Sequence, residues 1–318
     1  MPSRNEVIQL PLLESCVSAV VVLQVGHASA RLLPAAGARI SAVRLIPEGS
    51  HAAVDVLHAY PEDFFDPLHW AKGGIYPLMP YSNRIAQAHL QVDSTVVALA
   101  PHPDAAPHTL HGNAHALPWK LKFNDAAHAV LVLEAAASPA WPWRYTGRMV
   151  VHLSSSELSV TLSICNDDDR KMPAGLGLHP YFRHRPDARI GYCAGSIWPP
   201  TADFVALSSR APTPDESHVP AHALRAGGLT DYVGGWNGKA SVELPEGDLL
   251  EIQADPIFGH LVVHRPDSLA YLCLEPVSHV ADGFNLAARG VPDTGTHWLA
   301  PGESLAGSMR FSLRKVDA

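Results

Sequence analysis

The sequence has few charged residues and no concentrated run of one sign. Its 318 residues include 23 Lys and Arg against 31 Asp and Glu, a formal net charge of −8, and only 17% of the chain is charged. Without a cluster of basic residues to contact phosphates, nucleic acid is not an expected partner. Hydrophobic residues make up 47% of the chain, enough for a large packed core and too many for a disordered chain.

Long apolar runs are also absent, so no membrane partner is expected. No run approaches the roughly 18 residues that a membrane-spanning helix needs. The apolar run at 17–25 begins late, follows no basic segment and ends in no small-residue cleavage pattern, so we expect a first strand there and a cytoplasmic protein. The four cysteines, Cys16, Cys165, Cys193 and Cys273, lack any CxxC spacing. We expect them to be reduced and buried.

Helical periodicity is scarce, whereas short β-branched or alternating runs bounded by Gly, Pro, Asn or Asp recur along the whole chain. The pattern predicts an all-β protein, and without a repeat or a low-complexity linker we expect one domain over 1–318. SSSE at 154–157 and PEGD at 245–248 are predicted hairpin loops. The predicted strands are 17–25, 39–46, 95–100, 129–135, 148–153, 158–164, 239–244, 249–254, 260–264, 269–275 and 304–314.

Two long segments, 58–82 and 196–228, resist assignment to strands. The first is rich in aromatic residues and proline, and the second is irregular throughout. Long loops in a compact β protein are often functional. We therefore predict that both segments form walls of a binding cleft.

The stretch GLGLHPYF places His179 between a glycine-punctuated apolar run and a proline followed by two aromatic residues. Pro180 favours an extended backbone at His179, and the glycines permit close approach by another backbone or a ligand. The imidazole could act as a general acid or base. The same neighbours also suit a packed structural histidine, so this stretch alone leaves both readings open.

The stretch YLCLEP places Glu275 at the end of an apolar run. In a strand, Leu272 and Leu274 face one way, while Tyr271, Cys273 and Glu275 face the other, so both faces look buried. An unpaired carboxylate there would be costly. Glu275 is therefore either a base with a shifted pKa or a side chain that emerges into solvent at the strand terminus.

Three further stretches carry candidate ligand contacts. HTLHGNAHALPW, with His111, could bind metal, but no second ligand cluster follows, and a loop that presents one or two imidazoles to a polar ligand fits better. In GGIYPLMPYSNRI, Arg84 and Asn83 offer donors and an acceptor to ligand hydroxyls, although Arg84 could equally form a surface salt bridge. In LTDYVGGWNG, Asp231 is a candidate contact or only an Asx-turn residue.

Taken together and in this order, NRI, LHG with a downstream W, HPYF, LTDYVGGWNG and LEP followed by FN resemble the aldose 1-epimerase (mutarotase) family. The resemblance covers most of the chain from about residue 73 and is similar to the bacterial branch described as galactose mutarotase-like. It implies a large antiparallel β-supersandwich, in agreement with the strand pattern. It also implies an isomerase that interconverts the α and β anomers of a free hexose without cofactor or metal.

The resemblance also implies roles for six residues. His179 would be the general acid and Glu275 the general base, and His111 would be the second active-site histidine, bonded to the sugar. The implied substrate-binding residues are Asn83, Arg84 and Asp231. Two positions depart from the family pattern: Asn113 stands where many members have a second glycine after LHG, and Leu178 where many have Asn before the HPYF histidine.

Two other functions for the same site remain open. The cleft could bind a sugar without turning it over, or it could serve an epimerase of phosphorylated or otherwise modified hexoses. Arg183 and Arg185, just after HPYF, are compatible with the latter and equally with a solvated strand end. The sequence leaves both a monomer and a homodimer open.

Overall fold

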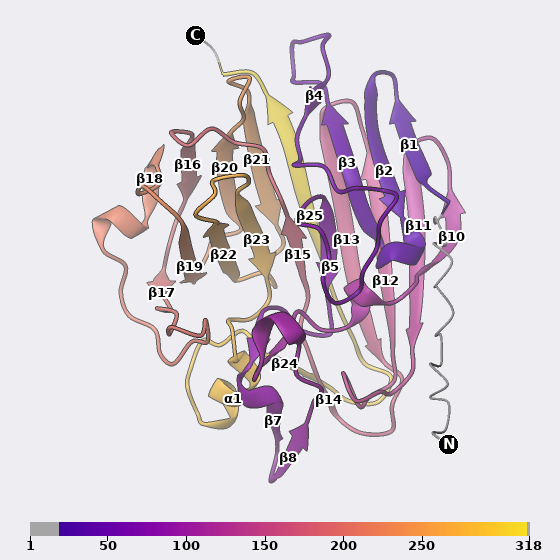
Figure 1. The fold of residues 1–318 in the computed structure, drawn as a ribbon, viewed down its shortest axis with the longest axis vertical. Helices are drawn as coiled ribbons and strands as arrows, with labels where there is room; N and C mark the ends of the chain where they lie inside the picture. Colours follow the sequence, from indigo (N-terminus) through magenta and orange to yellow (C-terminus); the bar gives the residue numbers. More distant parts are fainter. Residues whose placement is uncertain (1–18, 317–318) are drawn as a thin grey trace, which may run out of the picture.

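Residues 19–316 are described by a computed structural model (Figure 1). Cys16 and the first two residues of the predicted strand 17–25 lie outside the described residues. Two large sheets, both built from antiparallel pairs, dominate the architecture. The helical content is small: one α-helix, α1, at Gly283–Ala288, and 3-10 turns at Pro34–Ala36, Ala86–Ala88, Pro103–Ala105, Ala114–Ala116 and Pro214–Glu216.

The first sheet has ten strands in the order β1-β2-β3-β5-β15-β23-β22-β19-β17, with β4 paired to β3. Its strands are β1 Val21–Val25, β2 Ala28–Leu33, β3 Arg39–Leu45, β4 Val54–Asp55, β5 Ile75–Leu78, β15 Gly177–Pro180, β17 Ser196–Ile197, β19 Leu229–Gly234, β22 His260–Arg265 and β23 Cys273–Val277.

The second sheet has nine strands in the order β10-β11-β12-β13-β25-β21-β20-β16-β18. Its strands are β10 Lys120–Asn124, β11 His128–Ala135, β12 Tyr145–Leu153, β13 Glu157–Asn166, β16 Arg189–Tyr192, β18 His218–Ala223, β20 Lys239–Glu243, β21 Leu249–Ala254 and β25 Ser304–Arg314. Three small ribbons complete the fold: β6 Arg84–Ile85 with β9 Thr109–Leu110, β7 His89–Val92 with β8 Thr95–Ala98, and β14 Met172–Ala174 with β24 His297–Leu299.

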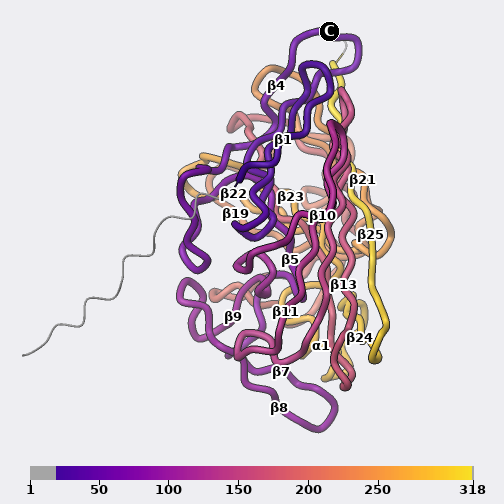
Figure 2. The backbone as a smooth tube through the Cα atoms, turned by 90° about the vertical axis from the view of Figure 1, so that its right-hand side faces the viewer, coloured from indigo at the N-terminus to yellow at the C-terminus, as the bar shows by residue number. Residues whose placement is uncertain are grey.

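The two large sheets lie face to face as layers (Figure 2). Their inward-facing residues alternate with outward-facing ones along each strand and form one extended core that includes Leu162 of β13, Leu178 of β15 and Leu274 of β23. The predicted all-β fold is therefore confirmed for the described residues. The hairpin predicted at SSSE is also present, because Leu153 pairs with Leu158 across it.

One predicted strand begins later than expected. Residues 269–275 were expected to form a strand, but β23 starts at Cys273, because Leu269 has φ of 55° and its N–H closes a turn onto the carbonyl of Pro266. Glu275 therefore lies in the middle of β23, and the strand runs on to Val277.

The expectation of buried cysteines is only partly correct. Cys273 is buried, whereas Cys165 and Cys193 are half-buried, and all three are free thiols. Cys165 lies on β13 among residues that alternate with the buried ones, so its side chain points away from the core. No helix within residues 19–316 is long and apolar enough to cross a membrane.

The outer face of the ten-stranded sheet carries a second, smaller apolar cluster that includes Tyr76, Tyr181 and Tyr232. The segments 58–82 and 196–228 both contribute side chains to the cleft on this face, among them Trp70 and Phe204. The prediction that these two segments form cleft walls is confirmed.

Candidate functional site

A single row of side chains crosses five neighbouring strands and forms the floor of the cleft. Directly opposed residues on adjacent strands share one face of a sheet. The register that pairs Gly177 with Val277, continued by two residues, sets His179 opposite Glu275. The adjoining pairs continue the row on either side. Its members, all lining a cleft of about 210 Å³, are Tyr76 of β5, His179 of β15, Glu275 of β23, Val262 of β22 and Tyr232 of β19.

His179 and Glu275 form the central pair of this row. The Nε2 atom of His179 lies 3.3 Å from the Oε1 atom of Glu275, and their side chains are only 8% and 4% exposed. The imidazole stacks on the rings of Tyr76 and Tyr181, with ring centroids 4.8 and 4.6 Å away. Glu275 therefore does not emerge into solvent, and His179 is both packed and in contact with a carboxyl group.

Burial shifts the pKa values of both groups. Desolvation raises the pKa of the Glu275 carboxyl well above its ordinary value, against the opposing charge of Arg84. Desolvation also lowers the pKa of the His179 imidazole well below its ordinary value, and the charges of His264 and Lys72 lower it further. Both shifts favour a protonated Glu275 facing a neutral His179. The ion pair differs from this state only by transfer of one proton between the two residues, at no change in net charge.

Asn83 and His111 hold each other through two hydrogen bonds. The backbone N–H of Asn83 donates to Nδ1 of His111 at 3.2 Å, and the backbone N–H of His111 donates to the carbonyl of Asn83 at 2.8 Å. Because Nδ1 accepts, the proton of the neutral ring sits on Nε2, which leaves a donor for a ligand. Burial lowers the pKa of His111 well below its ordinary value, so the neutral form is favoured. Both residues line the cleft.

Arg84 extends from the short strand β6 into the cleft wall. The side chain of Asn83 accepts hydrogen bonds from the backbone N–H of Arg84 at 2.9 Å and from its guanidinium at 3.5 Å. The guanidinium lies over the ring of Phe204, 4.9 Å from its centroid. No carboxylate among residues 19–316 forms an ion pair with it. The alternative of a surface salt bridge is therefore wrong, and the donors of Arg84 remain available to a ligand.

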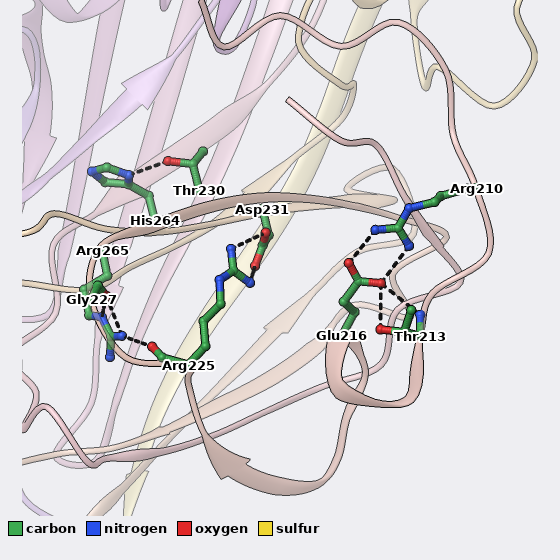
Figure 3. Close-up of polar contacts among 9 residues, drawn as sticks. All are labelled: Arg210, Thr213, Glu216, Arg225, Gly227, Thr230, Asp231, His264 and Arg265. Carbon is green, nitrogen blue, oxygen red and sulfur yellow. Dashed lines mark hydrogen bonds and ion pairs between the residues drawn. The ribbon is translucent and has the colours of Figure 1, made fainter. Parts of the chain in front are cut away.

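Asp231, in contrast, does not reach the cleft. Its neighbours Thr230 and Tyr232 line the cleft, and a strand directs alternate residues to opposite faces. Both carboxylate oxygens of Asp231 accept hydrogen bonds from Arg225, at 2.8 and 2.9 Å, whereas Thr230 bonds His264 on the other side of the ribbon (Figure 3). The expectation that Asp231 contacts sugar hydroxyls is not supported by this position.

The histidine-rich loop at 108–119 presents one imidazole to the cleft, that of His111. His108 lies outside it, with its Nε2 atom 3.0 Å from a carboxylate oxygen of Asp203. His115 is buried beneath the cleft and packs on Trp70, with ring centroids 4.6 Å apart. The three imidazoles of the loop therefore have different surroundings, and only that of His111 faces the cleft.

One group of three side chains in the described part of the chain could hold a metal ion. His179, Cys273 and Glu275 offer a nitrogen, a sulfur and an oxygen atom that all lie within 4.8 Å of one another. This donor set suits Zn²⁺, which binds imidazole, thiolate and carboxylate ligands. The expectation of a site without metal remains a prediction.

The comparisons with known proteins agree with this geometry. The family model for aldose 1-epimerase matches residues 20–312. The chain belongs to the aldose 1-epimerase family. It is 28% identical over 249 residues to the uncharacterized protein YphB of Escherichia coli K12, a match that covers 75% of this chain and 82% of YphB.

Two crystal structures show the same fold as this family member. One is a candidate aldose 1-epimerase of Escherichia coli K12, with a TM-score of 0.80, 23% identity and coverage of 93% of this chain and 99% of that one. The other is a galactose mutarotase-like protein of Clostridium acetobutylicum, with a TM-score of 0.78, 18% identity and coverage of 93% and 95%. The galactose mutarotase-like architecture expected from the motifs is thereby confirmed.

Both departures from the aldose 1-epimerase motifs lie outside the cleft. Leu178 is the neighbour of His179 on β15 and points into the core between the sheets. Asn113 is buried and accepts a hydrogen bond of 2.6 Å from the hydroxyl of Tyr145. Neither residue lines the cleft.

Several cleft residues of this family member were not predicted from the sequence. Trp70, Lys72 and Phe204 come from the two irregular segments, where only the segment and not the residue could be singled out. Of the remaining cleft residues, only Val262, His264 and Tyr271 lie on predicted strands, where alternation alone could have indicated a shared face. The others, which lie outside the predicted strands, are Tyr76, Asp104, Leu110, Tyr181, Thr230 and Tyr232.

Proposed function

We propose that the protein interconverts the α and β anomers of an aldohexose by acid/base-catalysed ring opening and closure. The contact between His179 and Glu275 on the cleft floor carries this proposal, because anomerisation needs one proton acceptor and one proton donor within reach of the same ring carbon. Family membership supports the reaction class. The cleft volume of about 210 Å³ lies below the roughly 300–1,000 Å³ of pockets for drug-sized ligands, which suits a monosaccharide.

In the first half-reaction, the Glu275 carboxylate takes the proton from the C1 hydroxyl while the His179 imidazolium donates its proton to the ring oxygen. The electron pair of the O–H bond forms the carbonyl at C1, and the bond between C1 and the ring oxygen breaks. The residues then hold a protonated carboxyl and a neutral imidazole, which is the state that burial favours.

Rotation about the bond between C1 and C2 presents the other face of the aldehyde. The ring closes when neutral His179 removes the proton of the C5 hydroxyl and Glu275 returns its proton to the carbonyl oxygen. Arg84 and His111, whose donors are free toward the cleft, would hold the sugar hydroxyls during this rotation. The pair ends in its starting state, ready for another turnover.

Polarimetry on freshly dissolved glucose and galactose tests the proposal. The protein should accelerate equilibration, and Glu275→Gln and His179→Asn should each lower kcat by about 100- to 10,000-fold while remaining folded. Matched controls are Glu243→Gln and His222→Asn, which lie on strands of the nine-stranded sheet and should retain full activity.

Two results would overturn the proposed reaction. The first is sugar binding, measured by calorimetry, with no acceleration of equilibration for any aldose. Such a protein would be a carbohydrate-binding module rather than an isomerase. The second is undiminished turnover in Glu275→Gln or His179→Asn, which would assign the proton transfers to other groups.

A further inference from the structure

Three cations gather around the cleft without carboxylate partners. The first, Lys72, is exposed at the cleft mouth, with its Nζ atom 4.6 Å from the centroid of the Trp70 ring. Within residues 19–316 no carboxylate forms an ion pair with its ammonium group. Its charge is therefore available to a ligand that enters the cleft.

The second cation, Arg39, lies behind the cleft wall. It is fully buried, and none of its three guanidinium nitrogens has a hydrogen-bond partner among the described residues. Aromatic rings surround it instead, the nearest being those of Tyr76 and Tyr60, with centroids 4.4 and 4.9 Å away. Cation–π contacts of this kind offset only part of the cost of burying an unpaired charge. Because Tyr76 also lines the cleft, a single aromatic ring separates the charge of Arg39 from the cleft.

The third cation is Arg84, whose guanidinium contacts Asn83 and Phe204 and no acid. Most other arginines in the described residues form ion pairs with acids, and Arg210 and Arg225 each form two hydrogen bonds to one carboxylate. The chain carries more acidic than basic residues, so a shortage of carboxylates does not explain the unpaired cations.

The acidic groups at the cleft do not cancel this charge. Only Asp104 and Glu275 line it, and Asp104 at the mouth lies 3.7 Å from His69 and acts on Lys72 by its charge without forming an ion pair with it. Glu275 faces His179 and is engaged in the proposed proton transfers. The cleft therefore has an excess of positive charge, and such a site attracts and discriminates in favour of anionic ligands.

We propose that the aldose accepted by this cleft carries an anionic substituent, which Lys72 binds at the mouth while Arg39 and Arg84 supply the complementary field. This inference rests on the proposed anomerisation and narrows its substrate class. The small cleft, of about 210 Å³, favours a carboxylate in place of the hydroxymethyl group, since that change adds no bulk, whereas a phosphate ester is larger.

The test compares charged and neutral sugars of the same configuration. Polarimetry, with the spontaneous rate subtracted, would give kcat/KM for glucuronate and galacturonate, for glucose 6-phosphate, and for glucose and galactose. We expect at least one anionic sugar to exceed its neutral counterpart by about 10-fold or more, the effect of one charge-assisted hydrogen bond. The two hexuronates and the phosphate ester separate carboxylate from phosphate recognition.

Two lysine variants test whether Lys72 causes the preference for anionic sugars. Lys72→Met should reduce the ratio of anionic to neutral kcat/KM by about 10-fold. Lys171→Met is the matched control, because Lys171 also lies over a tryptophan, 4.8 Å from the Trp298 ring centroid, but does not line the cleft. This control should keep the ratio of the unmodified protein.

Equal kcat/KM values for anionic and neutral sugars would overturn the anionic substrate class and leave anomerisation intact. An equal loss on both kinds of sugar in Lys72→Met, measured at a pH where the profiles of both proteins are flat, would also overturn it, since Lys72 would then not discriminate between anionic and neutral sugars. If no sugar is turned over, the proposed reaction fails instead, and calorimetric titration with glucuronate and glucose still decides whether the cleft selects anions.

Discussion

The imidazole of His179 and the carboxyl of Glu275 face each other across two adjacent antiparallel strands, with Nε2 and Oε1 3.3 Å apart. Their separation is set by the sheet register and not by a flexible loop, because Gly177 and Val277 pair two residues away. Stacking on Tyr76 and Tyr181 further restricts the imidazole. A pair positioned by regular backbone is well suited to transfer protons with little reorganisation.

We expect kcat/KM to follow a bell-shaped pH profile that belongs to this pair as a unit. Because burial lowers the pKa of His179, the acid limb should lie below the ordinary imidazole value of about 6.5. Because burial raises the pKa of Glu275, the alkaline limb should lie above the ordinary carboxyl value of about 4.3. Rates measured at about every half pH unit from about pH 4 to about pH 10 would define both limbs.

Lys72→Met should move the acid limb of this profile to higher pH, because the positive charge of Lys72 lowers the pKa of His179. In Lys171→Met the limb should stay in place, since Lys171 lies outside the cleft. A shift of the acid limb to lower pH in Lys72→Met would contradict the electrostatic account of the pair.

Asp231→Asn should leave anomerisation within about twofold of the unmodified rate, because the carboxylate points away from the cleft and binds Arg225. The lost ion pair, with Arg225 half exposed, should cost about 1 kcal/mol of stability or less. Thr230→Val, on the cleft side of the same strand, should lower kcat/KM by removing the bond to His264. Polarimetry measures the activity of both variants, and urea unfolding measures the stability of Asp231→Asn. A large activity loss in Asp231→Asn would contradict the observed strand orientation.

Two buried histidines predict loss of stability in mild acid. Burial lowers the pKa of His260 and of His279 to about 4, whereas an unfolded imidazole titrates near 6.5. Between these pH values both imidazoles are protonated in the unfolded chain and neutral in the folded protein. The free energy of unfolding should therefore fall as the pH drops from about 6.5 to about 4, by up to about 1.4 kcal/mol per pH unit for each histidine.

Urea unfolding at several pH values measures this slope. His279→Gln should reduce it, because the Nε2 atom of His279 accepts a hydrogen bond from the backbone N–H of Ser82 at 3.1 Å and must stay unprotonated to do so. His27→Gln, at an exposed turn position, is the matched control and should keep the slope. A slope unchanged in His279→Gln would rule out this histidine as a source of acid sensitivity.

Treatment with a chelator should leave the anomerisation rate unchanged, because the proposed proton transfers use the carboxyl and imidazole groups alone. Added Zn²⁺ should inhibit, because His179, Cys273 and Glu275 offer three suitable donors within 4.8 Å. Cys273→Ser should weaken this inhibition, since a hydroxyl is a poorer zinc ligand than a thiolate. Activity lost on chelation and restored by a metal would contradict the metal-free reaction.

Local patterns in the sequence were enough to predict the all-β fold, eleven of the 25 strands in the described residues and the two cleft-forming segments. Alternating apolar residues in 304–314 predicted β25 with its observed bounds, because alternation is a local property of a strand with one buried face. The strand 269–275 was misplaced because the left-handed turn at Leu269 has no glycine or asparagine to mark it.

The candidate site was likewise predicted only in part from the sequence. Short motifs were sufficient to single out His179, Glu275, His111, Asn83 and Arg84, all of which line the cleft. Asp231 does not line the cleft, and its motif could not show this, because the motif does not specify a strand or the face that each residue occupies. Lys72 and Arg39 carry no local signal at all, since a lone cation looks the same in sequence whether or not an acid lies nearby.

By itself the sequence determined the β-rich composition, the reactive residue types and their order along the chain, because these depend on local periodicity and chemistry. Only the tertiary structure decided which of these residues meet. Pairing of β15 with β23 sets His179 against Glu275, and the parity of β19 turns Asp231 away. The unpaired charges of Arg39, Arg84 and Lys72 likewise emerge only when distant segments pack together, because whether a charge is paired depends on its neighbours in space.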